Sequence, residues 1–243
     1  MAVEMKRRGF YLVHVCQDYP EPQLYEHAGI SDRTLTIQEN VFQILRGRFG
    51  SNVSFIADAI PDRAVSENGG WKPVPFLEKI PRPRLGYLGA PQKRLNRDLL
   101  FQVLKAHPEW HFVAFGESKI FDLPNVHTIP WLGQDQLRNC VEALDIGFMP
   151  YDCSLPLSFH CLPLKRLDYF AAGIPVVATP VLTLWNQTDM VYLGGTFEEL
   201  ETAISRALAE PRDDPRRGAR IRYASDHSIE NLARRLGEEL PLS

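Results

Sequence analysis

The alternation of short apolar runs with amphipathic segments is the feature that most restricts the fold of this chain. Between residues 84 and 210, runs typical of buried strands alternate with segments whose apolar residues recur at helical spacing. The strands are predicted over 84–90, 110–116, 125–132, 145–150, 175–179 and 190–194, and the helices over 96–108, 134–144, 163–173 and 196–210. Strands joined by helices of this length form parallel βαβ units, so we expect an α/β domain with a doubly wound parallel sheet.

The first part of the chain predicts a smaller set of similar elements. Apolar runs at 10–16, 33–37 and 52–57 indicate strands, and 38–50 indicates a helix. About 60 residues bury too little surface to be stable alone, so we expect the tail of a second α/β domain whose earlier strands are absent. Five prolines and two adjacent glycines within 60–84 are typical of a linker. The expected organisation is a partial domain over 1–63, a linker over 64–82 and a second domain over 83–240.

Composition narrows the function classes. The chain has 44% hydrophobic residues, 23% charged residues and a net charge of -3, as an ordinary soluble globular protein has. Nucleic acid is not expected as the main partner. The run at 10–16 contains His14 and breaks soon afterwards, which favours a buried strand over a signal peptide. No transmembrane segment is expected, and we place the protein in the cytoplasm or peripherally at a membrane surface.

The cysteines predict no structural site. The four of them show no CxxC and no disulfide-framework spacing, which favours reduced thiols. Cys153, His160 and Cys161 do not predict a metal site, because adjacent residues rarely both face one ion. We therefore expect no metal.

The stretch "PLKRLDYFAAGIPVVAT", residues 163–179, carries the strongest functional signal. Pro163 suits the first turn of a helix, and Gly173 suits a helix C-terminus. Lys165 and Asp168 are three residues apart and share one helical face. A helix N-terminus with a lysine in its first turn favours a phosphate, and Asp168 can accept hydrogen bonds from ribose hydroxyls. The alternative is a surface ion pair worth about 0.2–0.5 kcal/mol.

This stretch resembles the donor-binding motif of glycosyltransferase family 4, whose members have the GT-B fold. It differs from the family pattern by one acidic exchange, with Asp168 where the family has Glu. "PRLGYLGA" at 83–90 resembles the first strand and glycine turn of the family's Rossmann-like donor domain. Residues 123–151 resemble the segment that follows, and residues 10–63 resemble the last third of the acceptor domain.

The resemblance implies a role for each matching position. Lys165 would contact the diphosphate and Asp168 the ribose. The donor site would comprise Gly89, Ala90, Trp131, Leu132, Gly133, Pro163, Leu164, Lys165 and Asp168, with the glycine turn at the phosphates and 131–133 at the base. Some family members have an acidic residue that addresses the transferred sugar eight positions before the ribose-binding one. This chain has His160 there, so Lys165 and His160 are the catalytic candidates.

The resemblance predicts a glycosyltransferase, or its donor-binding half, involved in glycan biosynthesis. It would transfer a sugar from a UDP- or GDP-linked donor to a glycan, lipid or small-molecule acceptor, with retention and without a metal or cofactor. Two alternatives stay open: a non-catalytic nucleotide-sugar binding module that needs a partner chain or a second copy, and a sugar-nucleotide epimerase of the GT-B type.

The pattern alone also predicts the roles of three further residues. The loop over 151–160 is of the kind that closes over ligands, which makes Ser158 a candidate beside His160. His111 and His127 alternate with apolar neighbours, and we expect them to be packed strand residues.

Overall fold

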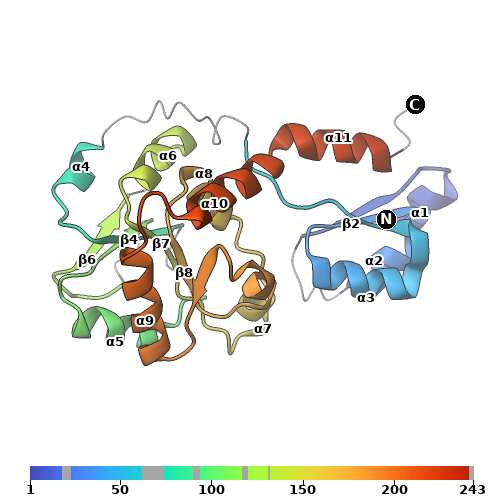
Figure 1. Cartoon of the computed structure of the whole chain (residues 1–243). Coiled ribbons are helices and arrows are strands. Elements are labelled where there is room, and N and C mark those ends of the chain that lie inside the picture. Colours follow the sequence, from blue (N-terminus) through green and yellow to red (C-terminus); the bar gives the residue numbers. More distant parts are fainter. Residues whose placement is uncertain (18–22, 62–73, 90–93, 117–119, 131, 241–243) are drawn as a thin grey trace.

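The chain folds into two lobes of unequal size, seen in the computed structural model (Figure 1). The structure describes residues 1–17, 23–61, 74–89, 94–116, 120–130 and 132–240. The small lobe holds a parallel sheet in the order β1-β2-β3. Its elements are α1 (Ala2–Arg7), β1 (Val13–Cys16), α2 (Leu24–Ile30), β2 (Arg33–Thr36), α3 (Glu39–Phe49), the 3₁₀ turn η1 (Gly50–Asn52) and β3 (Val53–Phe55). The prediction of a second α/β unit is therefore confirmed.

The large lobe is built on a six-stranded parallel sheet in the order β6-β5-β4-β7-β8-β9. Its strands are β4 (Arg84–Leu88), β5 (His111–Phe115), β6 (Val126–Ile129), β7 (Ile146–Met149), β8 (Val176–Ala178) and β9 (Val191–Leu193). The order confirms the predicted doubly wound sheet. The strand order reverses between β4 and β7, and such sheets bind ligands at the carboxyl ends of the two strands that flank the reversal.

Helices and a 3₁₀ turn complete the large lobe. They are α4 (Pro75–Glu78), α5 (Arg97–Ala106), α6 (Gln134–Glu142), α7 (Pro156–Phe159), α8 (Lys165–Ala172), η3 (Leu182–Gln187), α9 (Phe197–Leu208) and α10 (Pro215–Asp226). The last helix, α11 (Ile229–Glu239), lies beyond the large lobe (Figure 1). Local sequence explains several ends: Asn96 caps α5, Thr196 and Glu199 form a capping box on α9, and Gly173 ends α8 at φ +68°. Among the described helices, none is long and apolar enough to cross a membrane.

Two expectations about the first third of the chain need correction. The run at 10–16 was expected to be a buried strand, but β1 is an edge strand with Val13 and Val15 exposed. Among the described strands it pairs only with β2, and α2 and α3 pack with the small lobe's core on the opposite face of the sheet. The segment expected to be a linker, 64–82, is partly structured, because α4 forms within it and Leu77 is buried in the large core. Pro75 suits the first turn of that helix. Counting prolines as signs of a linker therefore missed α4.

The chain crosses between the lobes twice, and the two crossings pair with each other. Ile60 and Ser228 form a parallel bridge, in which the Ile60 amide donates to the His227 carbonyl and the Ile229 amide donates to the Ile60 carbonyl, both at 2.9 Å. After the second crossing, α11 returns to the small lobe (Figure 1), where Glu239 accepts hydrogen bonds from Arg33 and Ser54. The expected domain over 83–240 thus includes a helix that contacts the first sheet.

Helix α8 is held against the large sheet by a close steric fit. A Cβ at Gly147 would lie 2.3 Å from Cγ of Tyr169, so only glycine lets this ring pack on β7. The Tyr169 hydroxyl donates to the Gly86 carbonyl and accepts from the Leu88 amide, both at 2.9 Å. Because Lys165 lies one turn before Tyr169, this contact fixes where the lysine stands relative to the end of β4.

Buried arginines hold α8 on its other sides. Arg220 of α10 donates to the Gly173 carbonyl at the end of α8 and pairs with Glu210. Arg166 is 1% exposed and pairs through both terminal nitrogens with Asp58, which lies on the first crossing between the lobes. The Arg166 Nε also donates to Gln187 at 3.2 Å. The helix is therefore joined to the sheet, to α10 and to the crossing.

We expect Arg166→Met to lower the free energy of unfolding by about 3–5 kcal/mol, because it leaves Asp58 buried without its counter-charge. Adding Asp58→Leu should restore most of that loss, since an apolar pair can replace a buried ion pair. Urea denaturation measures both. The control is Arg234→Met, at an exposed pair with Glu238, where the change should stay within about 1 kcal/mol. A double variant as unstable as the single one would contradict this account.

Candidate functional site

The candidate site lies at the point where the strand order of the large sheet reverses. Gly89 follows β4 with a φ of +114°, a conformation that other residues rarely adopt. A Cβ at Gly89 would lie 3.5 Å from the Nζ of Lys165, the first residue of α8. The structure therefore brings the glycine turn and the lysine together, although 76 positions separate them in the sequence. Together they form a backbone turn facing a cation, as phosphate binding requires.

Two tyrosines surround the Lys165 amine. Its Nζ lies 3.5 Å from the centroid of the Tyr87 ring and 5.6 Å from that of Tyr151. The two rings meet edge to face at 6.3 Å, and burial raises the pKa of Tyr87 to about 12, so its phenol stays neutral. These rings hold the ammonium by cation–π attraction without neutralising it, which leaves its charge available to a ligand.

Burial favours the uncharged forms of Lys165 and Asp168 and shifts the pKa of each toward 7. Desolvation, assisted by the neighbouring Arg94 and opposed by Cys161 and Asp168, lowers the pKa of Lys165 to about 7. Desolvation raises the pKa of Asp168 to about 6, opposed by the cations Arg138 and Lys165. Strongly shifted groups that face each other in this way are typical of ligand sites.

Two arginines of the site were not found from the sequence. Arg94, in the segment before α5, acts electrostatically on Lys165 and is therefore a second cation near this amine. Arg138 of α6 is 8% exposed, and its Nη1 has no hydrogen-bond partner among the described residues. Its charge helps Asp168 to stay ionised. Helical spacing alone predicts neither, because Arg138 approaches Asp168 only when α6 packs beside α8.

The other predicted residues are distributed around this centre. Gly133 caps the start of α6, and Leu132 packs on the large core, so both lie at the carboxyl end of β6. Pro163 is buried and Leu164 is 50% exposed, directly before α8. Ala90 and Trp131 lie outside the described residues.

The segment before α8 contains the remaining two candidates. His160 follows α7, with its ring edge-on to Phe159 at 5.1 Å. Ser158 is fully buried and donates to the Arg94 carbonyl at 3.5 Å, so its hydroxyl supports the backbone at Arg94. His111 and His127 are packed strand residues, as predicted, with ring nitrogens 3.0 Å apart. The four cysteines form no disulfide bond among the described residues.

Solved structures of known enzymes share this architecture at low sequence identity. Sucrose-phosphate synthase from Thermosynechococcus elongatus matches with a TM-score of 0.71 and 15% identity, over 97% of this chain and 69% of that chain. An α,α-trehalose 6-phosphate synthase from Burkholderia multivorans matches with a TM-score of 0.72 and 13% identity, over 98% and 68%. The fold is the GT-B fold. A proposed UDP-N-acetylglucosamine 2-epimerase from Listeria monocytogenes has the same GT-B fold, with a TM-score of 0.61, 12% identity and coverage of 97% and 68%.

A sequence comparison adds one curated relative. It is a proposed teichuronic acid biosynthesis glycosyltransferase, TuaH, of Bacillus subtilis (strain 168), and it is 30% identical over 104 residues. The match covers 39% of this chain and 26% of the relative, so the chain spans about a quarter of that protein's length. No model of a protein family matches the chain. Synthases and an epimerase share the GT-B fold, which therefore does not fix the reaction.

We expect Lys165→Met to raise the stability of the ligand-free protein. The folded-state pKa of Lys165, about 7, lies below its unfolded value, so the charged amine opposes folding at and below pH 7. After allowance for partial exposure and for the Tyr87 ring, the gain should be about 1–3 kcal/mol at pH 7. It should shrink toward pH 10, where the amine of the folded wild type is neutral. Urea denaturation of both proteins from pH 6 to 10 measures the difference.

The matched control is Lys105→Met, at an exposed lysine of α5, which should change stability by less than about 0.5 kcal/mol at every pH. A Lys165→Met protein that is less stable than the wild type at pH 7 would show that the charged amine stabilises the fold.

Proposed function

We propose that this chain binds a nucleoside-diphosphate sugar and acts in glycosyl transfer as a retaining, metal-independent enzyme. The observation that carries the proposal is the Lys165 amine, held over the Tyr87 ring and against the Gly89 turn at the carboxyl end of β4. Dinucleotides and nucleotides bind in this part of doubly wound sheets. The names of the structural neighbours and of TuaH, which include UDP-forming synthases, support the choice of this ligand class.

The roles of the residues follow from their places in the site. Lys165, Arg94 and the N-terminus of α8 stabilise the negative charge that develops on the diphosphate as the sugar leaves. Asp168, kept ionised by Arg138, accepts hydrogen bonds from the ribose hydroxyls. His160, which precedes α8 by one short segment, hydrogen-bonds the transferred sugar. The resemblance to retaining family 4 enzymes supports retention and metal independence.

Calorimetric titration with UDP, GDP and ADP tests the binding step. One nucleotide should bind, and Lys165→Ala should weaken it about 10- to 100-fold, because a charge-assisted hydrogen bond contributes about 1.5–3 kcal/mol. Lys105→Ala, at the exposed lysine of α5, is the matched control and should bind as the wild type does. The proposal fails if no nucleotide binds, or if Lys165→Ala binds the nucleotide as tightly as Lys105→Ala does. Release of free nucleotide from a sugar conjugate then distinguishes an enzyme from a binding module.

The affinity for the nucleoside diphosphate should fall as the pH rises above about 7. The bound phosphates favour the protonated amine, so above the free-state pKa of Lys165 binding must take up a proton. This costs up to about tenfold in affinity per pH unit. In Lys165→Arg the cation stays charged throughout, and the affinity should not decline.

Titration of both proteins from pH 6 to 9 gives a ratio of affinities that is independent of the ligand's own ionisation. A ratio that does not change with pH would show that Lys165 does not titrate in this range.

A further inference from the structure

A cavity of about 720 Å³ lies between the two lobes. The small lobe lines it with residues that follow β2 and with the end of β3, and the large lobe lines it with η3 and with Leu162, shortly before α8. It is therefore next to the candidate donor site but formed by different side chains. Its volume lies within the range of about 300–1,000 Å³ that small-molecule sites occupy.

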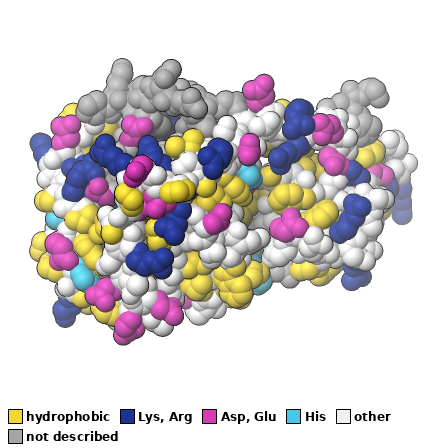
Figure 2. Space-filling view, in the orientation of Figure 1, with side chains coloured by type: hydrophobic (Ala, Val, Ile, Leu, Met, Phe, Trp, Pro, Cys, Tyr) yellow, Lys and Arg dark blue, Asp and Glu magenta, His cyan; other side chains and the backbone are white. Residues whose placement is uncertain are grey.

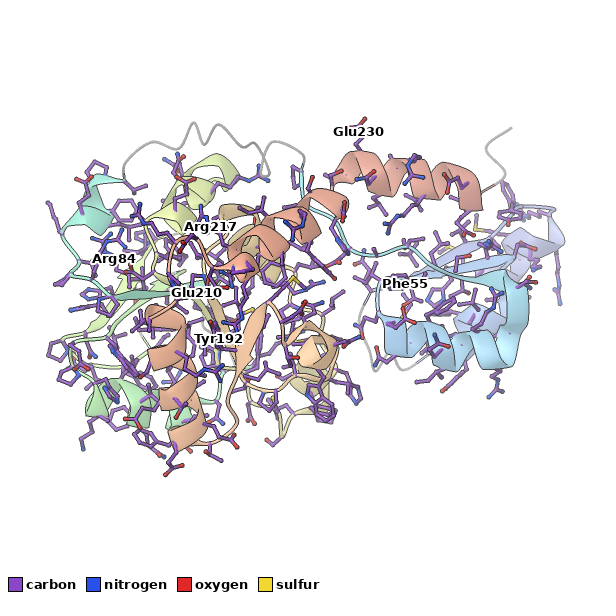
Figure 3. All side chains as sticks on the ribbon, in the orientation of Figure 1. Phe55, Arg84, Tyr192, Glu210, Arg217 and Glu230 are labelled. Atoms are coloured by element: carbon purple, nitrogen blue, oxygen red, sulfur yellow. The ribbon has the colours of Figure 1, made fainter. Side chains whose placement is uncertain are left out.

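Two exposed aromatic rings line the cavity from opposite lobes. Trp185 of η3 is 54% exposed, and Phe55 at the end of β3 is 38% exposed. Figure 3 shows Phe55 on the side of the small lobe that is turned toward the large lobe. Figure 2 shows hydrophobic side chains on the large lobe beside the junction of the lobes. Large apolar rings left open to solvent across a shared cavity indicate a surface that a ligand covers.

The indole of Trp185 is fixed in place before any ligand arrives. Its Nε1 donates to the Pro180 carbonyl at 3.0 Å, and its ring lies edge-on to Phe159 at 6.2 Å. Phe159 in turn contacts His160, the residue assigned to the transferred sugar. A ring held in this way loses little conformational entropy when a ligand stacks on it, which favours binding. Through Phe159, the Trp185 ring is thus connected to His160, at the end of the proposed donor that reacts.

Amide side chains supply the polar part of the cavity wall. Gln38 and Asn40 line it, and the side-chain oxygen of each has no hydrogen-bond partner among the described residues. Asn186, beside Trp185, is exposed. An amide both donates and accepts hydrogen bonds, as a hydroxyl group does. A wall of amides and aromatic rings therefore matches a ligand that has apolar C–H faces and a rim of hydroxyls.

The charges of the cavity argue against a phosphorylated ligand. Among the described residues that line it, the cation Arg166 is already paired with Asp58. Burial lowers the pKa of His227, so this ring is neutral at pH 7. The remaining charge is the carboxylate of Glu39. A phosphate placed here would meet a negative field with no available counter-charge.

We propose that this cavity is the acceptor site and that its ligand is an uncharged pyranoside, stacked between Trp185 and Phe55. The inference rests on the proposed glycosyl transfer. In that reaction an acceptor hydroxyl oxygen bonds to the anomeric carbon of the donor while the bond from that carbon to the diphosphate oxygen breaks. The hydroxyl proton leaves with the diphosphate, so no further reactant is needed. The sugar phosphate that accompanies one of the matched synthases is excluded as the acceptor of this chain.

Saturation-transfer NMR on the full chain tests the inference. The probes are the methyl pyranosides of glucose, galactose, mannose and N-acetylglucosamine at millimolar concentration, with glucose 6-phosphate as the charged comparison. We expect at least one methyl pyranoside to give a signal and glucose 6-phosphate to give none. The signal should fall at least fivefold in the double variant Phe55→Ala/Trp185→Ala. Phe101→Ala is the matched control, because Phe101 is equally exposed, at 38%, but lies on α5 outside the cavity.

Nucleotide titrations on the same samples separate the two proposals. The double variant should bind the nucleotide with wild-type affinity, and saturating nucleotide should leave the pyranoside signal in place. The acceptor assignment is overturned if no pyranoside binds, if the double variant binds equally well, if glucose 6-phosphate binds better, or if the nucleotide displaces the sugar. In each of those cases unchanged nucleotide affinity leaves the donor site standing. Failure of the wild type to bind any nucleotide overturns the proposed function, and the acceptor assignment falls with it.

Discussion

The buried ion pair between Arg166 and Asp58 is the interaction on which the arrangement of the site depends. It joins the first turn of α8 to the first crossing between the lobes, with Arg166 1% exposed and 3.1 Å between Nη2 and Oδ1. Neither charge can be solvated there, so each requires the other. Because Lys165 is the neighbour of Arg166 on the same turn, the pair helps to fix the Lys165 amine relative to the first crossing. The paired crossings and the contacts of α11 with the small lobe add to this connection.

Burial of the charges of Lys165 and Asp168 lowers the stability of the fold. Lys165 and Asp168 are surrounded by protein to the extent that their pKa values approach 7 and 6. A chain optimised for stability alone would place apolar residues at both positions. The surrounding contacts compensate in part, since Tyr169 is hydrogen-bonded to the backbone of β4 and Arg220 donates to the Gly173 carbonyl at the end of the same helix. Stability is thus concentrated on the faces of α8 that do not meet the ligand.

Sequence periodicity predicted the nine strands that form the two sheets, because apolar runs and helical spacing are local properties. It also placed Lys165 and Asp168 on one helical face. It failed where neighbours decide the outcome: Val13 and Val15 of β1 are exposed on the face of the sheet that α2 and α3 do not cover, and α11 contacts the small lobe, which is distant in the sequence. Arg138 belongs to the site through the packing of α6 on α8, which no spacing in the sequence records.

The proposed donor site and the proposed acceptor cavity differ in charge, and this difference would separate anionic from neutral ligands. Lys165 and Arg94 are cations that suit a diphosphate, whereas among the described residues that line the cavity Glu39 is the charge without an ion-pair partner. An anionic ligand entering the cleft is therefore directed to the turn at Gly89 and away from Trp185. The net electrostatic force on an uncharged sugar is small, so the proposed acceptor would bind by stacking on aromatic rings and by hydrogen bonds to amide side chains. In the proposed retaining reaction the acceptor oxygen approaches the face of the sugar from which the diphosphate leaves, because the hydroxyl proton passes to that diphosphate.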